Sequence, residues 1–417
     1  MKTFLTAILL LIFHFNSNAQ WIELNVGNTA ATNFTDVYAI TSDIVIVVGT
    51  NGTIIKTTDG GVTWQQKNSG TTQNLGKIQF PKSDIGYVVE GGGKLLKTID
   101  GGETWLSIPI TVENINSVYS LSCVNENLIF LSCVDSNSKT VLLKSSNGGG
   151  SWETVNGNDE QAKFYDIQFF NEEIGYATSN YIPYTNLNKI LKTQDGGKNW
   201  FEIIEPYYSP FNFINKDIGF YYTNGFYKTT DGGDNFEILG YGSIHNVTSI
   251  FAINENTVWG IFDEQTMCGC GQRGLVRMTY SSENGYKEYL QIMSAYISSI
   301  YFSNVKVGYA VGVENSKAKV WKNTQADLTL DAKEGELKNS ISIYPNPASD
   351  KITISLNNQP LKESFVSIID MTGKVVYSQN INNANKLTID VRGFSKGNYI
   401  VTIQNQKQNH SQKIIIK

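Results

Sequence analysis

Arginine and histidine are scarce in this chain of 417 residues. The three arginines are Arg273, Arg277 and Arg392, and the only histidine between residues 20 and 324 is His245. There is no block of basic residues, and the formal net charge is −5, so we expect no nucleic-acid partner. A serine hydrolase would have to use His245 as its base, and no nucleophile motif surrounds that residue.

Long apolar runs are also absent after the first residues. Lys2 precedes an apolar run from Phe4 to Phe13, and Ser-Asn-Ala at 17–19 offers a cleavage site. The run is shorter than the roughly 20 residues that a membrane-spanning helix needs. The pattern therefore predicts a secretory signal peptide over residues 1–19 and no membrane span.

Cysteine is limited to four residues. Cys123 and Cys133 lie near opposite ends of a predicted hairpin, too far apart for a disulfide, and we expect them to act as small buried hydrophobic residues. Cys268 and Cys270 could form a strained disulfide or half of a metal site. No histidine or further cysteine stands nearby to complete a zinc set, so we predict no metal and no cofactor.

One short motif is present in five copies, which are 36 to 48 residues apart. Its frame is Thr/Ser-x-Asp/Asn-x-Gly-x-Thr/Ser/Asn-Trp/Phe. The acid or amide and the aromatic residue of each copy are Asp59 and Trp64, Asp100 and Trp105, Asn147 and Trp152, Asp195 and Trp200, and Asp231 and Phe236. Repeats of this period are typical of propellers and solenoids.

The motif has a structural interpretation. In the first copy, Gly60 and Gly61 supply the positive φ of a tight turn, and the Asp59 carboxylate can bond nearby backbone N–H groups. Trp64 would pin the hairpin to an apolar layer. The motif resembles the Asp-box, or BNR, repeat. In that family the boxes lie on the rim away from the binding face, which implies a structural role for all ten residues.

Strand patterns extend the repeat to seven units. Alternating residues between turns indicate four antiparallel strands in each unit. The second strand of each unit is expected at Asp43–Val48, Ile85–Val89, Asn127–Ser132, Ile174–Thr178, Ile218–Tyr222, Thr257–Ile261 and Val307–Val311. We predict an all-β protein, with a seven-bladed β-propeller over residues 20–324 followed by a small C-terminal β-sandwich.

The ends of the propeller are predicted to pair. The seventh unit stops after Val320–Asn323 without an outer strand, whereas Trp21–Leu24 resembles the outer strand Trp105–Ile108. The first segment would then complete the last blade and close the ring.

Two resemblances follow from longer segments. Ile85–Val89, a short turn, and Leu95–Trp105 are similar to the photosystem II stability/assembly factor family, whose members are seven-bladed, non-enzymatic binding scaffolds. That family's photosynthetic role involves an arginine-rich surface, which this chain lacks, so we expect a different partner. Sialidases share the Asp box but need three arginines, and this propeller has only Arg273 and Arg277.

The last residues have a different composition. Residues 325–339 are polar and acidic and are predicted to form a linker. Residues 340–417 contain Ile341–Ser349, Ile369–Val375, Gly393–Tyr399 and Lys413–Lys417, and they resemble the type A C-terminal sorting domain of the type IX secretion system. The resemblance implies passage through the periplasm, contact with the type IX machinery, and a secreted or outer-membrane-surface protein.

Two functions stay open. The first, which we favour, is a non-enzymatic binding or adhesion scaffold for an extracellular glycan or protein. The second is a polysaccharide-active glycoside hydrolase, which needs two carboxylates at a defined separation. Its candidates on the rim opposite the boxes are Asp159, Glu160, Asp263 and Glu264.

The ligand site is predicted on that same rim, over the fourth to sixth blades, where loops lengthen and aromatic residues gather. Tyrosine suits both sugar stacking and protein contacts. The candidate residues are Tyr181, Tyr184, Tyr207, Tyr208, Tyr241, His245, Asp263 and Arg273. The alternative is that these tyrosines pack on one another and stiffen the loops.

Overall fold

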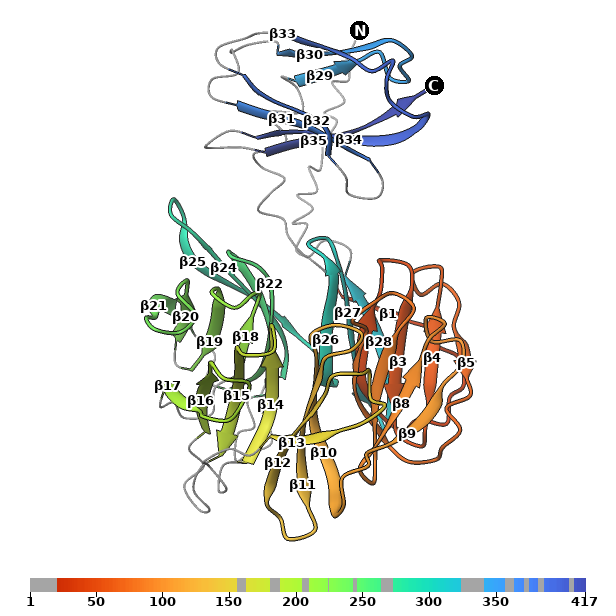
Figure 1. The fold of residues 1–417 in the computed structure, drawn as a ribbon, viewed down its shortest axis with the longest axis vertical. Coiled ribbons are helices and arrows are strands. Elements are labelled where there is room, and N and C mark those ends of the chain that lie inside the picture. The colour runs from red at the N-terminus through yellow and green to blue at the C-terminus, as the bar shows by residue number, and fades with distance from the viewer. Residues whose placement is uncertain are drawn as a thin grey trace, which may run out of the picture. The chain divides into compact units, whose positions relative to one another are not determined.

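A computed structural model describes residues 21–417, apart from 156–162, 181–187, 205–209, 224, 243–245, 264–272, 324–340, 357–363, 371–374, 382–385 and 405–408. The chain divides into two compact units, residues 1–326 and 327–417. The described residues of both units form strands and turns (Figure 1). The predicted signal peptide and linker lie outside the described residues.

The described residues of the first unit form seven antiparallel sheets of four strands each. From the innermost strand outward, the first four sheets are β2 (Phe34–Ala39), β3 (Val45–Gly49), β4 (Ile54–Thr57) and β5 (Gln65–Lys67); β6 (Leu75–Gln79), β7 (Gly86–Glu90), β8 (Lys94–Thr98) and β9 (Leu106–Pro109); β10 (Ile115–Cys123), β11 (Ile129–Asp135), β12 (Thr140–Ser145) and β13 (Glu153–Val155); and β14 (Lys163–Phe169), β15 (Gly175–Asn180), β16 (Asn188–Thr193) and β17 (Phe201–Ile204). The last three are β18 (Phe211–Phe213), β19 (Gly219–Tyr222), β20 (Gly225–Thr229) and β21 (Glu237–Tyr241); β22 (Val247–Asn254), β23 (Thr257–Asp263), β24 (Arg273–Ser281) and β25 (Gly285–Ile292); and β26 (Tyr296–Asn304), β27 (Val307–Glu314), β28 (Lys317–Asn323) and β1 (Ile22–Leu24).

The second strand of each blade forms its core, because blades pack face to face. Every residue of β3 and of β7 is buried. Between these two blades, Ile46 and Val48 of β3 share one apolar cluster with Val88 of β7 and Leu96 of β8. Burial on both faces explains why the second strands are runs of apolar residues rather than alternating ones.

The last sheet contains both ends of the propeller. β1 pairs antiparallel with β28 and places Ile22 opposite Lys322 and Leu24 opposite Val320. Trp21, 4% exposed, packs edge-to-face against Trp259 at 5.4 Å between ring centroids. The predicted closure of the ring by the N-terminal strand is therefore confirmed.

The Asp-box turns lie at one rim. Asp59 Oδ1 accepts hydrogen bonds from Thr57 Oγ1 at 2.7 Å and from the Thr63 backbone N–H at 2.9 Å. Gly60 has φ 71°, and its N–H donates to the carbonyl of Asp43 in the turn between β2 and β3 at 3.0 Å. The boxes therefore sit at the C-terminal ends of the innermost strands, and the turns between second and third strands sit at the opposite rim.

The aromatic residue of each box packs against the preceding blade. Trp105 shares a cluster with Ile46 of the first blade, and Trp152 shares one with Tyr87 of the second. The remaining boxes follow the same pattern, with Trp64, Trp200 and Phe236 in clusters that include Tyr309, Phe130 and Tyr176. Each box thus fastens two blades together.

Cys123 and Cys133, the two cysteines among the described residues, are free thiols, as predicted. Val118 lies opposite Cys133 and Cys123 lies opposite Ile129, so the two residues are near opposite ends of the β10–β11 pair. Burial raises the pKa of both thiols. Cys268 and Cys270 lie outside the described residues.

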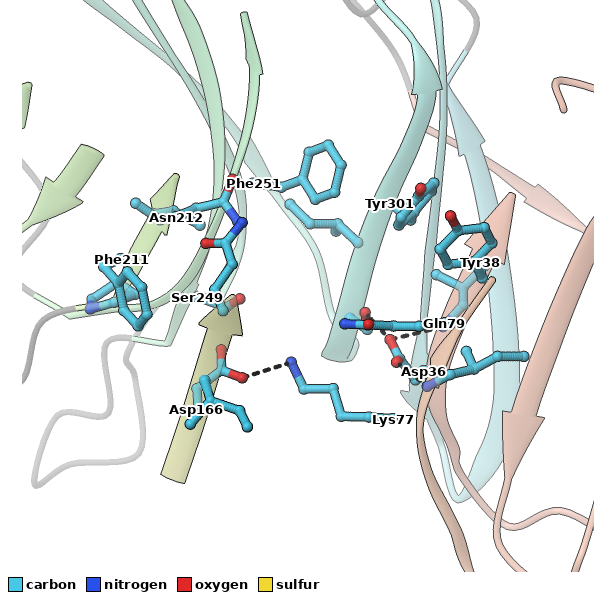
Figure 2. A pocket seen from close by; sticks show the side chains of 18 of the residues that line it. Asp36, Tyr38, Lys77, Gln79, Asp166, Phe211, Asn212, Ser249, Phe251 and Tyr301 are labelled. Carbon is cyan, nitrogen blue, oxygen red and sulfur yellow. Dashed lines mark hydrogen bonds and ion pairs between the residues drawn. The ribbon is translucent and has the colours of Figure 1, made fainter. Parts of the chain in front are cut away.

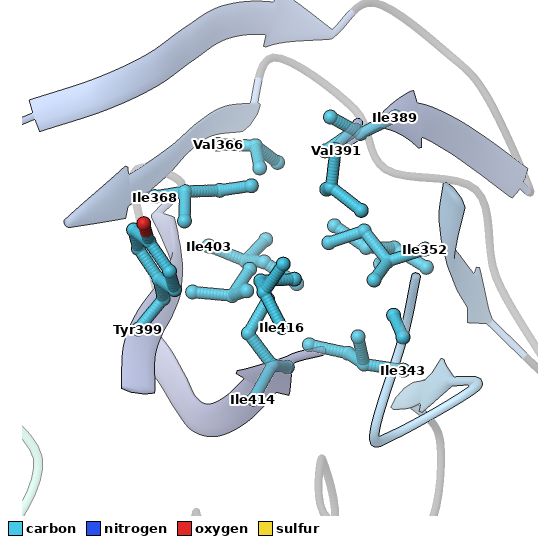
Figure 3. Close-up of a cluster of buried hydrophobic side chains, with 13 residues drawn as sticks. Ile343, Ile352, Val366, Ile368, Ile389, Val391, Tyr399, Ile403, Ile414 and Ile416 are labelled. Atoms are coloured by element: carbon cyan, nitrogen blue, oxygen red, sulfur yellow. The ribbon is translucent and has the colours of Figure 1, made fainter. Parts of the chain in front are cut away.

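The second unit is a β-sandwich. One sheet has the order β29 (Ile341–Tyr344), β30 (Lys351–Leu356) and β33 (Lys386–Asp390). The other has the order β32 (Val375–Ile381), β31 (Ser364–Asp370), β34 (Gly397–Gln404) and β35 (Asn409–Ile416). Ile352, Val366, Ile368 and Val401 are fully buried in its own apolar core (Figure 3).

Candidate functional site

A cavity of about 750 Å³ lies inside the ring of blades. All seven innermost strands contribute to its wall, with Asp36, Lys77, Cys123, Asp166, Asn212, Ser249 and Ser299 as one residue from each. Figure 2 shows polar and aromatic side chains from opposite blades pointing toward one another across this space. The cavity is therefore the candidate binding site.

Charged residues occupy one level of the cavity. Lys77 Nζ on the second blade lies 3.5 Å from Asp166 Oδ1 on the fourth blade, and both side chains are nearly half-exposed (Figure 2). Ser120 of the intervening blade donates to the same Asp166 oxygen at 2.7 Å. This ion pair presents an ammonium and a carboxylate to anything that enters the cavity.

Asp36 is turned into the wall. Its carboxylate accepts hydrogen bonds from the Ile78 N–H at 2.8 Å, from Ser299 Oγ at 2.5 Å and from the Val37 N–H at 3.0 Å. Burial raises the pKa of Asp36, against the attraction of Lys77. Attraction by Asp166 raises the pKa of Lys77, so the ammonium form is favoured.

Aromatic residues occupy the level nearer the Asp-box rim. Tyr301 lies 4.4 Å from Tyr38 and 5.2 Å from Phe251, measured between ring centroids. Tyr38 and Phe251 come from the first and sixth blades, on either side of the seventh (Figure 2). The cavity therefore offers apolar ring surface at one level and charge at the next.

Hydrogen bonds between innermost strands hold the wall in place. Tyr38 OH donates to the Phe80 carbonyl, and Gln79 Oε1 accepts from the Cys123 N–H. The same kind of bond joins Ser122 to Phe169 N–H, Gln168 to the Phe213 N–H and carbonyl, and Asn212 to Ala252 N–H. Each side chain reaches the backbone of the next blade, so the cavity is pre-formed.

Both carboxyl groups of the cavity are already engaged by other groups of the wall. The Asp36 carboxyl group accepts hydrogen bonds from three donors of the wall. The Asp166 carboxylate is paired with Lys77 and accepts a hydrogen bond from Ser120.

Within the described ranges, no group of three or more His, Cys, Asp and Glu side chains could hold a metal ion. The same described part of the chain contains no helix long and apolar enough to cross a membrane.

The rim residues predicted from sequence are only partly described. Tyr181, Tyr184, Tyr207, Tyr208 and His245 lie outside the described residues, as do Asp159, Glu160 and Glu264. Tyr241 ends strand β21 rather than lying in a loop, and it is 78% exposed.

Asp263 and Arg273 form a different structure from the expected loop. They end β23 and begin β24, lie opposite each other, and approach to 3.6 Å between Asp263 Oδ1 and Arg273 Nε. The Arg273 guanidinium also lies over the Tyr296 ring at 3.7 Å from its centroid. These two residues are thus engaged with each other and with the blade.

The cavity residues were not singled out in the sequence, although a signal exists. Asp36, Lys77 and Asp166 each immediately precede the buried aliphatic residue of an innermost strand. Aligning the seven units on Val37, Ile78 and Ile167 would have placed the three charges at one level. The predicted site rested instead on the long loops of the fourth to sixth blades, on the rim opposite the Asp boxes.

Two family models match the chain. Residues 13–132 match the family described as photosynthesis system II assembly factor YCF48. Residues 342–417 match the secretion system C-terminal sorting domain. Both predicted resemblances are therefore confirmed, and the tail indicates a secreted or cell-surface protein handled by the type IX secretion machinery.

Solved structures show the same fold. YCF48 bound to D1 peptide aligns with a TM-score of 0.55 and 15% identity, over 74% of this chain and 97% of that one. YCF48 from Cyanidioschyzon merolae gives 0.51 and 16%, over 74% and 99%. The WD40 propeller domain of Doa1 gives 0.51 and 13%, over 73% and 97%. At these identities the likeness shows the propeller fold alone.

Two curated relatives match short segments. An ulvan lyase of Nonlabens ulvanivorans is 29% identical over 97 residues, which is 23% of this chain and 17% of the relative. An endo-acting ulvan lyase of Formosa agariphila is 26% identical over 118 residues, or 27% and 22%. The chain thus spans about a fifth of the length of these relatives.

Proposed function

We propose that the protein is a secreted, non-enzymatic binding scaffold whose axial cavity takes part of an extracellular ligand, a glycan or a protein. One observation carries the proposal. The cavity wall is fixed by hydrogen bonds between blades, while the Lys77–Asp166 pair faces the open space. Pre-organised polar groups beside aromatic rings favour binding, because little side-chain entropy is lost.

The sequence-predicted rim would extend this site. Tyr181, Tyr184, Tyr207, Tyr208, Tyr241 and His245 are proposed to widen the contact surface over the fourth to sixth blades, with Asp263 and Arg273 stiffening one edge. We infer further that residues 1–19 are removed, that the chain crosses the periplasm, and that the sorting tail is cleaved after export.

A polysaccharide-active enzyme is the second candidate, and the short matches to ulvan lyases favour it. One assay distinguishes a binding scaffold from a polysaccharide-active enzyme. The mature chain is incubated with a panel of polysaccharides, and new reducing ends and unsaturated sugar ends are measured. Binding without chain cleavage supports the scaffold, and cleavage of any member of the panel contradicts it.

The site itself is tested by substitution. The ligand is first found with a glycan array and a pull-down from the extracellular fraction. Lys77→Ala should weaken its binding about tenfold, as expected for losing a charged hydrogen-bond donor. Lys216→Ala is the matched control, because it removes another half-exposed lysine of an ion pair, at the Asp-box rim. Equal affinities in wild type and Lys77→Ala would move the site away from the cavity.

A further inference from the structure

Six of the seven innermost strands carry a β-bulge at the same level. In each of these blades, the innermost strand has one more residue than the second strand between two successive paired positions. The residues at the bulges are Thr35, Gly76 with Lys77, Tyr119, Tyr165, Thr248 and Ser298. A bulge re-aims a side chain out of the regular alternation of a strand, and bulges are frequent beside binding sites.

The bulges surround the end of the cavity that lies away from the Asp boxes. In β2, Phe34 pairs with Gly49, next to the turn between second and third strands, whereas Ala39 pairs with Val45, near the box. Thr35 therefore lies toward the rim opposite the boxes. Tyr165 and Thr248 line the cavity itself.

Two neighbouring blades differ from the rest at this level. The position compared is the residue directly before the cavity-lining polar residue of each innermost strand, such as Asp36 or Lys77. Four of the bulged strands have Thr, Gly or Ser at this position, whereas the third and fourth blades have Tyr119 and Tyr165. Their rings stack at 5.7 Å between centroids with 29° between planes. They remain 40% and 45% exposed, so part of each ring is open to a ligand.

The tyrosine pair adjoins the charges of the cavity. Ser120 and Asp166 directly follow the two tyrosines, and Ser120 Oγ donates to Asp166 Oδ1 at 2.7 Å. Lys77 Nζ lies 3.5 Å from that same oxygen. Tyr165, Asp166 and Lys77 all line the cavity, so an aromatic ring shares the wall with a carboxylate and an ammonium, which together accept and donate hydrogen bonds.

We propose that Tyr119 and Tyr165 form a platform for a neutral sugar ring, with Asp166 accepting from its hydroxyl groups and Lys77 donating to them. This inference rests on the proposed binding function and specifies its ligand. A sugar ring has an apolar C–H face and a polar edge, which match the tyrosine rings and the adjacent charges.

Charge argues against an acidic sugar. At this level the only ammonium of the cavity lining, that of Lys77, is already paired with the Asp166 carboxylate, and the Asp36 carboxyl group lies behind them, hydrogen-bonded within the wall. A uronate or sulfate group would meet the carboxylates after desolvation, and unpaired like charges in a partly buried site are costly. Neutral oligosaccharides should therefore bind better than polyuronates of the same length.

The test is a calorimetric titration of the mature chain with neutral hexasaccharides and with a hexauronate. Tyr119→Ala and Tyr165→Ala should each weaken binding of the neutral glycan about tenfold, as expected for a lost aromatic contact. Tyr165→Phe keeps the ring and should bind within about twofold of wild type. Phe201→Ala is the matched control, because it removes an exposed aromatic residue from an outer strand.

Each outcome decides something. Neutral glycan binding that is lost in both alanine variants, with their melting temperatures unchanged, supports the platform. Binding that survives both substitutions, or a preference for the hexauronate, overturns it. If wild type binds a protein through Lys77 and no glycan, the sugar inference fails while the proposed scaffold function stands. Cleavage of the glycan overturns both.

Discussion

At the scale of single residues, the Asp box is a self-contained turn. The Asp59 carboxylate accepts from Thr57 Oγ1 and from the Thr63 N–H through one oxygen and from Thr63 Oγ1 at 2.6 Å through the other. In the third blade Asn147 occupies the equivalent position, and its Nδ2 donates a hydrogen bond to Ser151 Oγ at 2.9 Å. The turn needs a side-chain oxygen at this position and tolerates the loss of the charge.

This natural exchange gives a first prediction. Asp59→Ala should lower the melting temperature of the propeller, because the Thr57 and Thr63 donors lose their acceptor. Asp59→Asn should lower it less, since the amide oxygen keeps the bond to the Thr63 N–H. Differential scanning calorimetry of the two variants measures the difference. Equal melting temperatures for the alanine variant and wild type would show that the box does not stabilise the fold.

The same turn predicts a pH dependence. Hydrogen bonds from the Thr63 side chain, then from its backbone N–H, lower the pKa of Asp59 to about 2, and bonds from Asn235 do the same for Asp231. A depressed folded-state pKa stabilises the fold above the unfolded value of roughly 4. That stabilisation is lost as the pH falls through about 2.

The check is urea unfolding of wild type and Asp59→Asn between neutral pH and pH values near the folded-state pKa. The difference in the free energy of unfolding should be constant above the unfolded pKa and should shrink as the solution is made more acidic. A difference that does not change with pH would mean that the carboxylate charge contributes nothing.

At the scale of an element, β1 is the strand that closes the ring. It has only three residues, and two of them are exposed. Its contribution comes from pairing with β28 and from Trp21, which precedes it and contacts Trp259 and Phe302. Closing the ring removes the open edges that an incomplete seventh blade would leave.

Trp21→Ala should therefore destabilise the whole propeller. Truncating a buried aromatic residue in this environment costs about 3–5 kcal/mol. Ile22→Ala in the same strand is the control, because Ile22 is 59% exposed and surface substitutions usually change stability by less than about 0.5 kcal/mol. Urea unfolding measures both. A small cost for Trp21→Ala, equal to that of Ile22→Ala, would contradict the role given to this closure.

At the scale of the whole molecule, the propeller and the sandwich have separate cores. The buried cluster of the sandwich contains only residues between Ile343 and Ile416. The clusters of the propeller contain only residues between Trp21 and Trp321. A chain organised in this way can lose its tail without losing the propeller core.

Deletion of residues 341–417 should leave the urea midpoint of the propeller unchanged and should stop export. Cell fractionation and mass spectrometry of the medium and outer surface measure the second effect. Lys386→Ala, an exposed change within the tail, should be exported normally. Recovery of the truncated chain outside the cell in wild-type amounts would show that the tail is not the sorting signal.

The sequence alone determined the fold class, the number of blades and the pairing of the two ends. These follow from local and repeated signals. Gly60 and Gly61 mark a turn wherever that turn lies, and the runs Val45–Gly49 and Gly86–Glu90 are apolar because each blade buries them on both faces. The tail was recognised for the same reason, since its segments are each contiguous in the chain.

Only the tertiary structure decided where the proposed binding cavity lies. Lys77 and Asp166 are 89 residues apart, and Tyr119 and Tyr165 are 46 apart, so no local pattern brings them together. They meet because seven innermost strands surround one cavity and because bulges in β10 and β14 place Tyr119 and Tyr165 at the same level of neighbouring strands. A bulge depends on register between two strands, which the order of residues in one strand does not express.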